Sequence, residues 1–134
     1  MSGFKIGNAF IENGLCLAPL AGVSDYAFRQ VCRLCGAEYT VSEMVSAKAL
    51  CYEMKIRKND KSLARSAPLA FVDEKSLPHA VQIFGRESTF MAQAARLIEN
   101  RSYFGCESEC APTAIDINMA APFTRLYQTG KEAL

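Results

Sequence analysis

The sequence predicts an α/β fold in which parallel strands alternate with helices. Four short segments rich in β-forming or apolar residues recur along the chain, and each ends at polar or turn-forming residues. The four segments are Leu15–Ala18, Glu38–Val41, Ala80–Phe84 and Ala114–Ile117. Helical patterns lie between them, and strands separated by helices favour a parallel sheet joined by right-handed crossovers.

Length and composition restrict the class of protein. The chain has 134 residues, 50% hydrophobic and 22% charged, which is typical of one globular domain. Its net charge of +1 gives no overall field for nucleic acid, so any RNA contact requires a local patch. Apolar runs fall short of the roughly 20 residues of a membrane helix. The N-terminus has no secretory signal, so we expect a cytoplasmic protein whose six cysteines are reduced.

The N-terminal third predicts a hairpin followed by one strand–helix unit. Gly7–Asn8 is a turn signal between two short strands. Leu15–Ala18 is apolar without alternation, as expected for a strand buried on both faces. Ser24 is a candidate N-cap for the next helix, and Gly36 is its expected stop. The predicted buried face of that helix consists of Phe28, Val31, Cys32 and Cys35.

Two further units follow. After Glu38–Val41, the polar Ser42–Met44 segment precedes a predicted helix from Ser46 to about Met54. Lys55–Arg65 is a basic connector, which fits either a solvated surface or contact with RNA phosphates. Ala80–Phe84 precedes a helix whose predicted inner face is Met91, Ala94, Ala95 and Ile98.

The fourth segment ends in the most informative residues. The predicted strand Ala114–Ile117 is expected to be buried, and it stops at Asn118 before a turn that contains Pro122. In a barrel of alternating strands and helices, the chemistry gathers at the carboxyl ends of the strands.

Five segments together resemble the tRNA-dihydrouridine synthase family, and within it the bacterial B-type enzymes. The most specific is Asp116-Ile117-Asn118-Met119, which is similar to the start of the family's Asp-Ile-Asn-Met-Gly-Cys-Pro signature. The other segments are Leu17–Asp25, Phe28–Arg29, Ser42–Ser46 and Val81–Gly85.

The resemblance implies a flavin-binding (β/α)8 TIM barrel followed by a small helical domain. Residues 1–134 would be the N-terminal half of that barrel, preceded by the short hairpin, with the C-terminal half and the helical domain absent. The implied reaction is reduction of a tRNA uridine to 5,6-dihydrouridine. NADPH reduces FMN, the flavin N5 delivers hydride to uracil C6, and a cysteine protonates C5.

The resemblance also implies roles for particular residues. Pro19, Leu20 and Ala21 would line the flavin, and Gln82 would hydrogen-bond the edge of its ring. Asn118 would hold the flavin or the uracil, and Glu43 would join Asn118 in binding substrate. No metal is expected. Taken alone, Gln82 also fits a satisfied core amide, Asn118 a turn cap and Glu43 a surface carboxylate.

The main departure from the family lies at Ala120–Ala121, where the family has Gly-Cys. Ala121 occupies the position of the proton donor and has no titratable group. A positioned general acid contributes about 10²–10⁴ in rate. We therefore expect the isolated chain to be inactive, both for want of this acid and because half a barrel is missing.

Several alternatives stay open at this stage. Another FMN-dependent barrel reductase acting on a small molecule is one, and a non-catalytic relic or RNA-binding half-barrel is another. The pairs Cys32–Cys35 and Cys106–Cys110 suggest a metal site, but the first pair lies on a predicted helix and His79 is the only histidine. A metal centre is therefore disfavoured.

Overall fold

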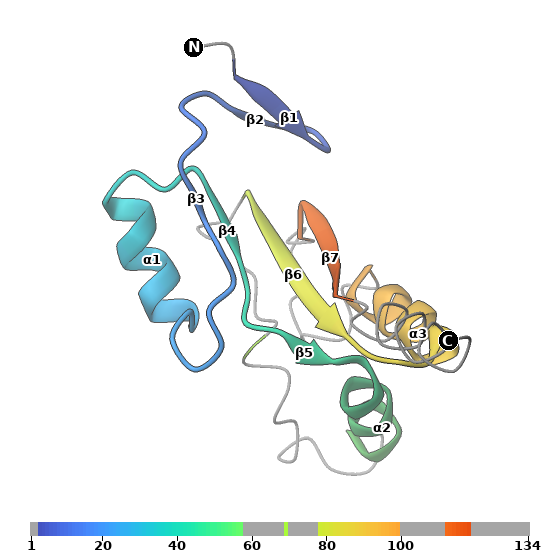
Figure 1. The fold of residues 1–134 in the computed structure, drawn as a ribbon. Helices are drawn as coiled ribbons and strands as arrows, with labels where there is room; N and C mark the ends of the chain where they lie inside the picture. Colours follow the sequence, from blue (N-terminus) through green and yellow to red (C-terminus); the bar gives the residue numbers. More distant parts are fainter. Residues whose placement is uncertain (1–2, 58–68, 70–77, 100–111, 119–134) are drawn as a thin grey trace, which may run out of the picture.

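A computed structural model of the chain describes residues 3–57, 69, 78–99 and 112–118. A parallel sheet forms its centre (Figure 1). The strands of this sheet are β3 (Cys16–Leu17), β4 (Tyr39–Val41), β5 (Val45–Ser46), β6 (His79–Phe84) and β7 (Ala114–Asn118).

The strands lie in the order that the sequence predicts. β3 pairs with β4, β4 with β6 and β6 with β7, in each case in parallel. The carboxyl ends of all these strands therefore meet at one edge of the sheet. A parallel sheet that follows chain order and alternates with helices is the arrangement of part of a (β/α)8 barrel, so the predicted fold class is confirmed.

A β-bulge interrupts the second strand of this series. Val41 pairs with Ala80 and Val45 pairs with Ile83, both on the same side of β6. The chain advances four residues (45 − 41) while β6 advances three (83 − 80), so one extra residue is inserted. β4 and β5 thus continue one another around Ser42–Met44. The predicted helix start at Ser46 is wrong by one residue, because Val45–Ser46 pairs with β6 before α2 (Ala47–Arg57) begins.

One face of the sheet packs on two helices. α2 and α3 (Ser88–Glu99) lie side by side (Figure 1), and they cover Val81 and Ile83 of β6. Burying each large apolar side chain here contributes about 1.5–3 kcal/mol. The predicted inner face of α3 is confirmed, with Met91, Ala94 and Ile98 buried and Ala95 packed against them.

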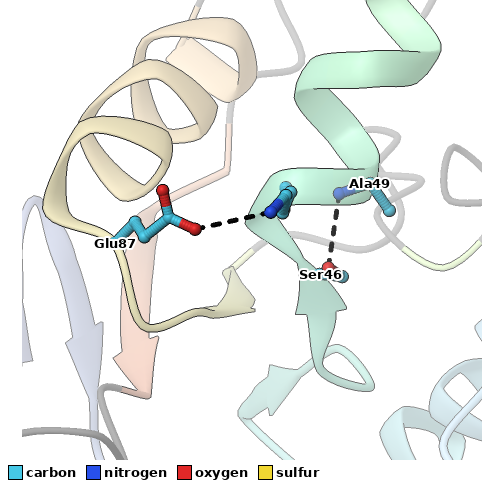
Figure 2. Close-up of polar contacts among 4 residues, drawn as sticks. Ser46, Ala49 and Glu87 are labelled. Carbon is cyan, nitrogen blue, oxygen red and sulfur yellow. Dashed lines mark hydrogen bonds and ion pairs between the residues drawn. The ribbon is translucent and has the colours of Figure 1, made fainter.

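Polar contacts fix the start of α2 beside α3 (Figure 2). The Ser46 hydroxyl accepts a hydrogen bond of 3.3 Å from the Ala49 backbone N–H, which leaves one less unpaired donor in the first turn. Lys48 Nζ lies 3.4 Å from Glu87 Oε1. Both side chains of this ion pair are exposed, so it contributes about 0–1 kcal/mol.

The predicted hairpin is confirmed and packs against the other face of the sheet. β1 (Phe4–Ile6) and β2 (Ala9–Ile11) pair antiparallel, and Gly7 adopts a positive φ of 57° in the turn. Ile11 is fully buried against Tyr39 and Ala80. Tyr39 is the first residue of β4 and Ala80 the second residue of β6, so the hairpin covers the amino end of the sheet and leaves the carboxyl edge at the opposite end (Figure 1).

Two predictions about α1 (Tyr26–Leu34) are wrong. Asp25 is its N-cap, because the Asp25 carboxylate accepts from the Phe28 N–H at 2.8 Å while Ser24 is engaged in the preceding loop. The predicted buried face is largely exposed. Phe28, Val31 and Cys35 are exposed and Cys32 is half-buried, since none of the described elements covers that side of the helix.

The two outer strands are also more exposed than the sequence predicts. Cys16 of β3 is exposed, and so are the last three residues of β7, Asp116–Asn118. Among the described strands, β3 pairs only with β4 and β7 only with β6. An apolar run indicates a strand covered on both sides only when neighbours cover it. Among the described residues, no helix is long and apolar enough to cross a membrane.

Candidate active site

The carboxyl edge of the sheet brings together the predicted site residues that the structure describes. Pro19, Leu20 and Ala21 lie in the loop between β3 and α1, and Glu43 lies in the β4–β5 bulge. Gln82 lies on β6, two residues before its end, and Asn118 is the last residue of β7. Phe84 is the register partner of Asn118, so the two strands end side by side. The functional roles of these residues stay predictions.

Ser24 closes the β3–α1 loop into a compact turn. Its hydroxyl accepts from the Leu20 N–H at 2.9 Å and donates to the Leu20 carbonyl at 3.0 Å. The backbone N–H groups of Val23 and Ser24 also donate to that carbonyl. Gly22 adopts a φ of 75°, a conformation that favours glycine. The loop therefore has a defined shape at the edge of the sheet.

Arg29 ties this loop to α1. It is 1% exposed, and its Nη1 donates to the Ser24 carbonyl at 2.9 Å. Its guanidinium also lies 6.0 Å from the centre of the Tyr26 ring. A buried charge requires such partners, because an unpaired one is costly to remove from water. The sequence placed Arg29 in a motif but assigned it no role.

Glu43 connects the bulge to the loop. One oxygen of its half-buried carboxylate accepts from the Gly22 N–H at 2.6 Å. A hydrogen bond to an ionised acceptor is about twice as strong as a neutral one. This contact fixes the loop against the bulge, while the part of Glu43 in binding substrate stays a prediction.

Ser42 supplies a hydrogen-bond acceptor that the sheet lacks at the bulge. Its side chain is fully buried, and its hydroxyl accepts from the Gln82 N–H at 3.0 Å and donates to the Glu43 carbonyl at 2.8 Å. Its own N–H donates to the Ala80 carbonyl at 2.9 Å. The hydroxyl thus replaces the ladder acceptor that the extra residue displaces.

Gln82 and Asp116 face each other across β6 and β7. They are register partners, and Gln82 Nε2 donates to Asp116 Oδ2 at 2.7 Å. Tyr39 lies on the same face of the sheet. Burial raises the pKa of its hydroxyl above the ordinary value of 10.0, and negative charges on Asp116 and Cys16 raise it further. The face that carries Gln82 is therefore polar toward the carboxyl edge and apolar at the amino end, where Ile11, Tyr39 and Ala80 pack together. The face with Val81 and Ile83 is apolar.

The site has the mixture of surfaces that binds a flat aromatic ring. Amide and carboxylate groups in fixed positions occur beside exposed apolar side chains at the same edge. These apolar side chains are Leu20, Val23, Met44 and Phe84. Among the residues that the structure describes, no atom lies within 4 Å of a Cβ added at Gly22. Sites for cofactors are mostly apolar with a few placed polar groups.

The family model for dihydrouridine synthase (Dus) matches residues 16–131. The chain belongs to the dihydrouridine synthase family. tRNA-dihydrouridine synthase B of Pseudomonas syringae pv. tomato is 38% identical over 122 residues, which are 91% of this chain and 31% of that protein.

Two further relatives show the same relationship. tRNA-dihydrouridine synthase B of Escherichia coli is 36% identical over 118 residues, covering 88% of this chain and 31% of that protein. A probable tRNA-dihydrouridine synthase of Treponema pallidum is 33% identical over 129 residues, covering 96% and 33%. The chain thus spans about a third of the length of these dihydrouridine synthases. No solved structure matched it.

Some residues predicted from the dihydrouridine synthase resemblance lie outside the described part of the chain. They are Ala121 with its neighbours Ala120 and Pro122, and most of the basic connector Lys55–Arg65. Cys106 and Cys110 lie outside it as well. Within residues 3–57, 69, 78–99 and 112–118, no three His, Cys, Asp or Glu side chains group as a metal site would require.

Proposed function

We propose that this chain carries the flavin-facing and uridine-facing edge of a tRNA-dihydrouridine synthase, an oxidoreductase that uses FMN and NADPH. Membership of the family supports the reaction class. The observation that carries the proposal is the meeting of the Pro19–Ala21 loop, Gln82 and Asn118 at one carboxyl edge. That edge is where barrel enzymes place their chemistry.

The residues present fit a flavin. An isoalloxazine ring has an apolar body and a polar edge, and the site offers apolar side chains such as Leu20 next to the amide of Gln82. FMN reduced by NADPH would supply the hydride that reduces the uracil ring. Pro19, Leu20 and Ala21 would line the body of the flavin.

The polar residues would orient the two rings. Gln82 would hydrogen-bond the polar edge of the flavin, and Asn118 would hold the flavin or the uracil. Glu43 would contribute to the substrate site by fixing the loop that borders it, because its carboxylate accepts the hydrogen bond from the Gly22 N–H. These contacts would fix the distance and angle between the rings, on which transfer between bound groups depends.

Position 121 would determine how the proton reaches uracil C5. Reduction of the C5–C6 double bond adds hydride at one carbon and a proton at the other, and Ala121 has no proton to give. We expect the turnover rate to be lower by a factor of about 10²–10⁴ than in a chain with an acid at this position. The 134-residue chain alone, as about a third of a relative's length, would be inactive.

The proposed substrate sets the partner and the compartment. A tRNA would be bound in the cytoplasm, and the basic side chains of Lys55–Arg65 would meet its phosphates. The proposal includes the remainder of the barrel, which would complete the flavin site.

The test is product formation by a completed barrel. The chain is fused to the C-terminal part of the Escherichia coli synthase B. The fusion protein is incubated with FMN, NADPH and an amount of unmodified tRNA equal to that of the protein, and dihydrouridine is measured by mass spectrometry. We expect dihydrouridine to form slowly. Asn118→Ala should reduce its rate at least tenfold, because one oriented hydrogen bond to a ring is lost. Asn8→Ala, the same change in the hairpin at the opposite end of the sheet, should leave the rate unchanged.

Two results would contradict the proposal. A flavin-loaded fusion that consumes NADPH with a small molecule and never modifies tRNA would indicate a small-molecule reductase. A folded fusion that binds tRNA without flavin would indicate a non-catalytic RNA-binding relic.

A further inference from the structure

The contact between Gln82 and Asp116 has a fixed chemical direction. An ionised carboxylate only accepts hydrogen bonds, whereas a side-chain amide both donates and accepts. The group of Gln82 that lies 2.7 Å from Asp116 Oδ2 must therefore be the NH₂ group, as the structure has it. A carboxylate beside an amide thus selects one of the two orientations that the amide otherwise adopts with nearly equal ease.

Gln82 is held at its backbone as well as at its side chain. Its N–H donates to the buried Ser42 hydroxyl at 3.0 Å, and its Nε2 donates to Asp116. The residue is 9% exposed and lies two residues from the end of β6. These two hydrogen bonds, to Ser42 and to Asp116, leave little freedom to the side-chain amide of Gln82. The carbonyl oxygen of that amide is then the group that can accept a hydrogen bond from a ligand.

A carbonyl oxygen in a fixed position suits a ligand that presents an N–H at the edge of a ring. The imide of a flavin or of a uracil is such a group, because an N–H lies there between two carbonyls. An amide with free rotation would offer its NH₂ group to that N–H half of the time, and two donors repel. The carboxylate prevents this mismatch.

We propose that Asp116 is a positioning residue, which orients the Gln82 amide so that its carbonyl oxygen accepts from the imide N–H of the bound ring. This inference rests on the proposed function, in which Gln82 faces the flavin. Asp116 acts through Gln82 and is exposed, two residues before the end of β7, so its replacement does not open the helix-covered core.

The first test uses the 134-residue chain without flavin. In a ¹⁵N spectrum of the side-chain amides, the two Gln82 N–H signals should be widely separated in the parent chain, because one proton binds a carboxylate. Asp116→Asn, which is nearly isosteric, should bring them together. Glu99→Gln on the exposed end of α3 removes the same charge and should change neither signal. Unchanged Gln82 signals in Asp116→Asn would overturn the inference.

The second test uses the completed barrel with FMN and with uridine as separate ligands. Asp116→Asn should weaken the ligand that meets Gln82 by about tenfold, as expected for one misoriented hydrogen bond, and should shift the flavin absorbance if that ligand is FMN. Asp116→Ala serves if Asp116→Asn does not fold. If Asp116→Asn binds each ligand as tightly as the parent barrel does and the flavin spectrum is unchanged, the positioning role is overturned while the proposed function stands. A parent barrel that binds no flavin would overturn the proposed function itself.

Discussion

Replacing Ser42 with alanine tests how the β-bulge holds the site together. The hydroxyl of Ser42 makes two hydrogen bonds, to the Gln82 N–H at 3.0 Å and to the Glu43 carbonyl at 2.8 Å. Alanine removes both and adds no bulk, so the change isolates the polar contacts.

The two losses have different consequences. The Gln82 N–H is buried within β6 and would have no acceptor, which costs about 1–3 kcal/mol. The Glu43 carbonyl belongs to a half-buried residue, where water can replace the hydroxyl at little cost. We therefore expect the free energy of unfolding to fall by about 2 kcal/mol.

Urea unfolding measures this change. With a slope of about 2 kcal/mol per molar urea, the midpoint of Ser42→Ala should fall by about 1 M at unchanged slope. The control Thr89→Ala removes an exposed hydroxyl on α3 and should change the unfolding free energy by less than about 0.5 kcal/mol. The reasoning would be refuted if the urea midpoint of Ser42→Ala differed from that of the parent chain by no more than the midpoint of Thr89→Ala does. The Gln82 N–H would then have found another acceptor.

Three further predictions concern the hairpin, the Tyr39 hydroxyl and the cofactor. Ile11→Ala should lower the free energy of unfolding by about 2–5 kcal/mol, measured by calorimetry, because Ile11 is fully buried; a loss under about 1 kcal/mol would mean that the hairpin does not pack on the sheet. The pKa of Tyr39 is raised, so its contribution to stability is present below pH 10.0 and lost as the pH rises through the folded pKa. Tyr39→Phe should flatten the fall in stability above that pH, and an unchanged pH profile would contradict the assigned burial. The purified 134-residue chain should be colourless, because barrels build the phosphate site from later loops; a stoichiometric yellow flavin would show otherwise.

The sequence was sufficient for the order of the main strands. The segments around Tyr39, Val81 and Ile115 are short and rich in β-forming or apolar residues, and the helices between them leave a parallel sheet as the simple solution. The inner face of α3 followed from its spacing. These features depend on local periodicity, which a single sequence contains.

Features that depend on distant partners could not be predicted. Ser24 and Asp25 are both good N-caps, and Asp25 caps α1 because Ser24 is engaged with Leu20. The bulge depends on one extra residue relative to β6, which appears only when the two strands are paired.

The site shows the same division. Gln82 and Asn118 were placed correctly at the carboxyl edge, because each lies near the end of a predicted strand. The contact of Gln82 with Asp116 was missed, since it requires the register of β6 and β7. The exposure of Phe28 and Val31 was missed because spacing defines an apolar face without saying what covers it.

The most direct measurement of the central claim is a single turnover in the completed barrel. The flavin is reduced, unmodified tRNA is added, and flavin reoxidation is followed in the parent Ala121 protein and in Ala121→Cys. We predict reoxidation that depends on tRNA in both proteins and is faster by about two orders of magnitude in Ala121→Cys. A thiol with a pKa of about 8.5 is mostly protonated at neutral pH and can donate to C5. Reduction of the flavin by NADPH should be the same in both proteins. Reoxidation that does not respond to tRNA in either protein would contradict the claim that this edge of the sheet reduces uridine.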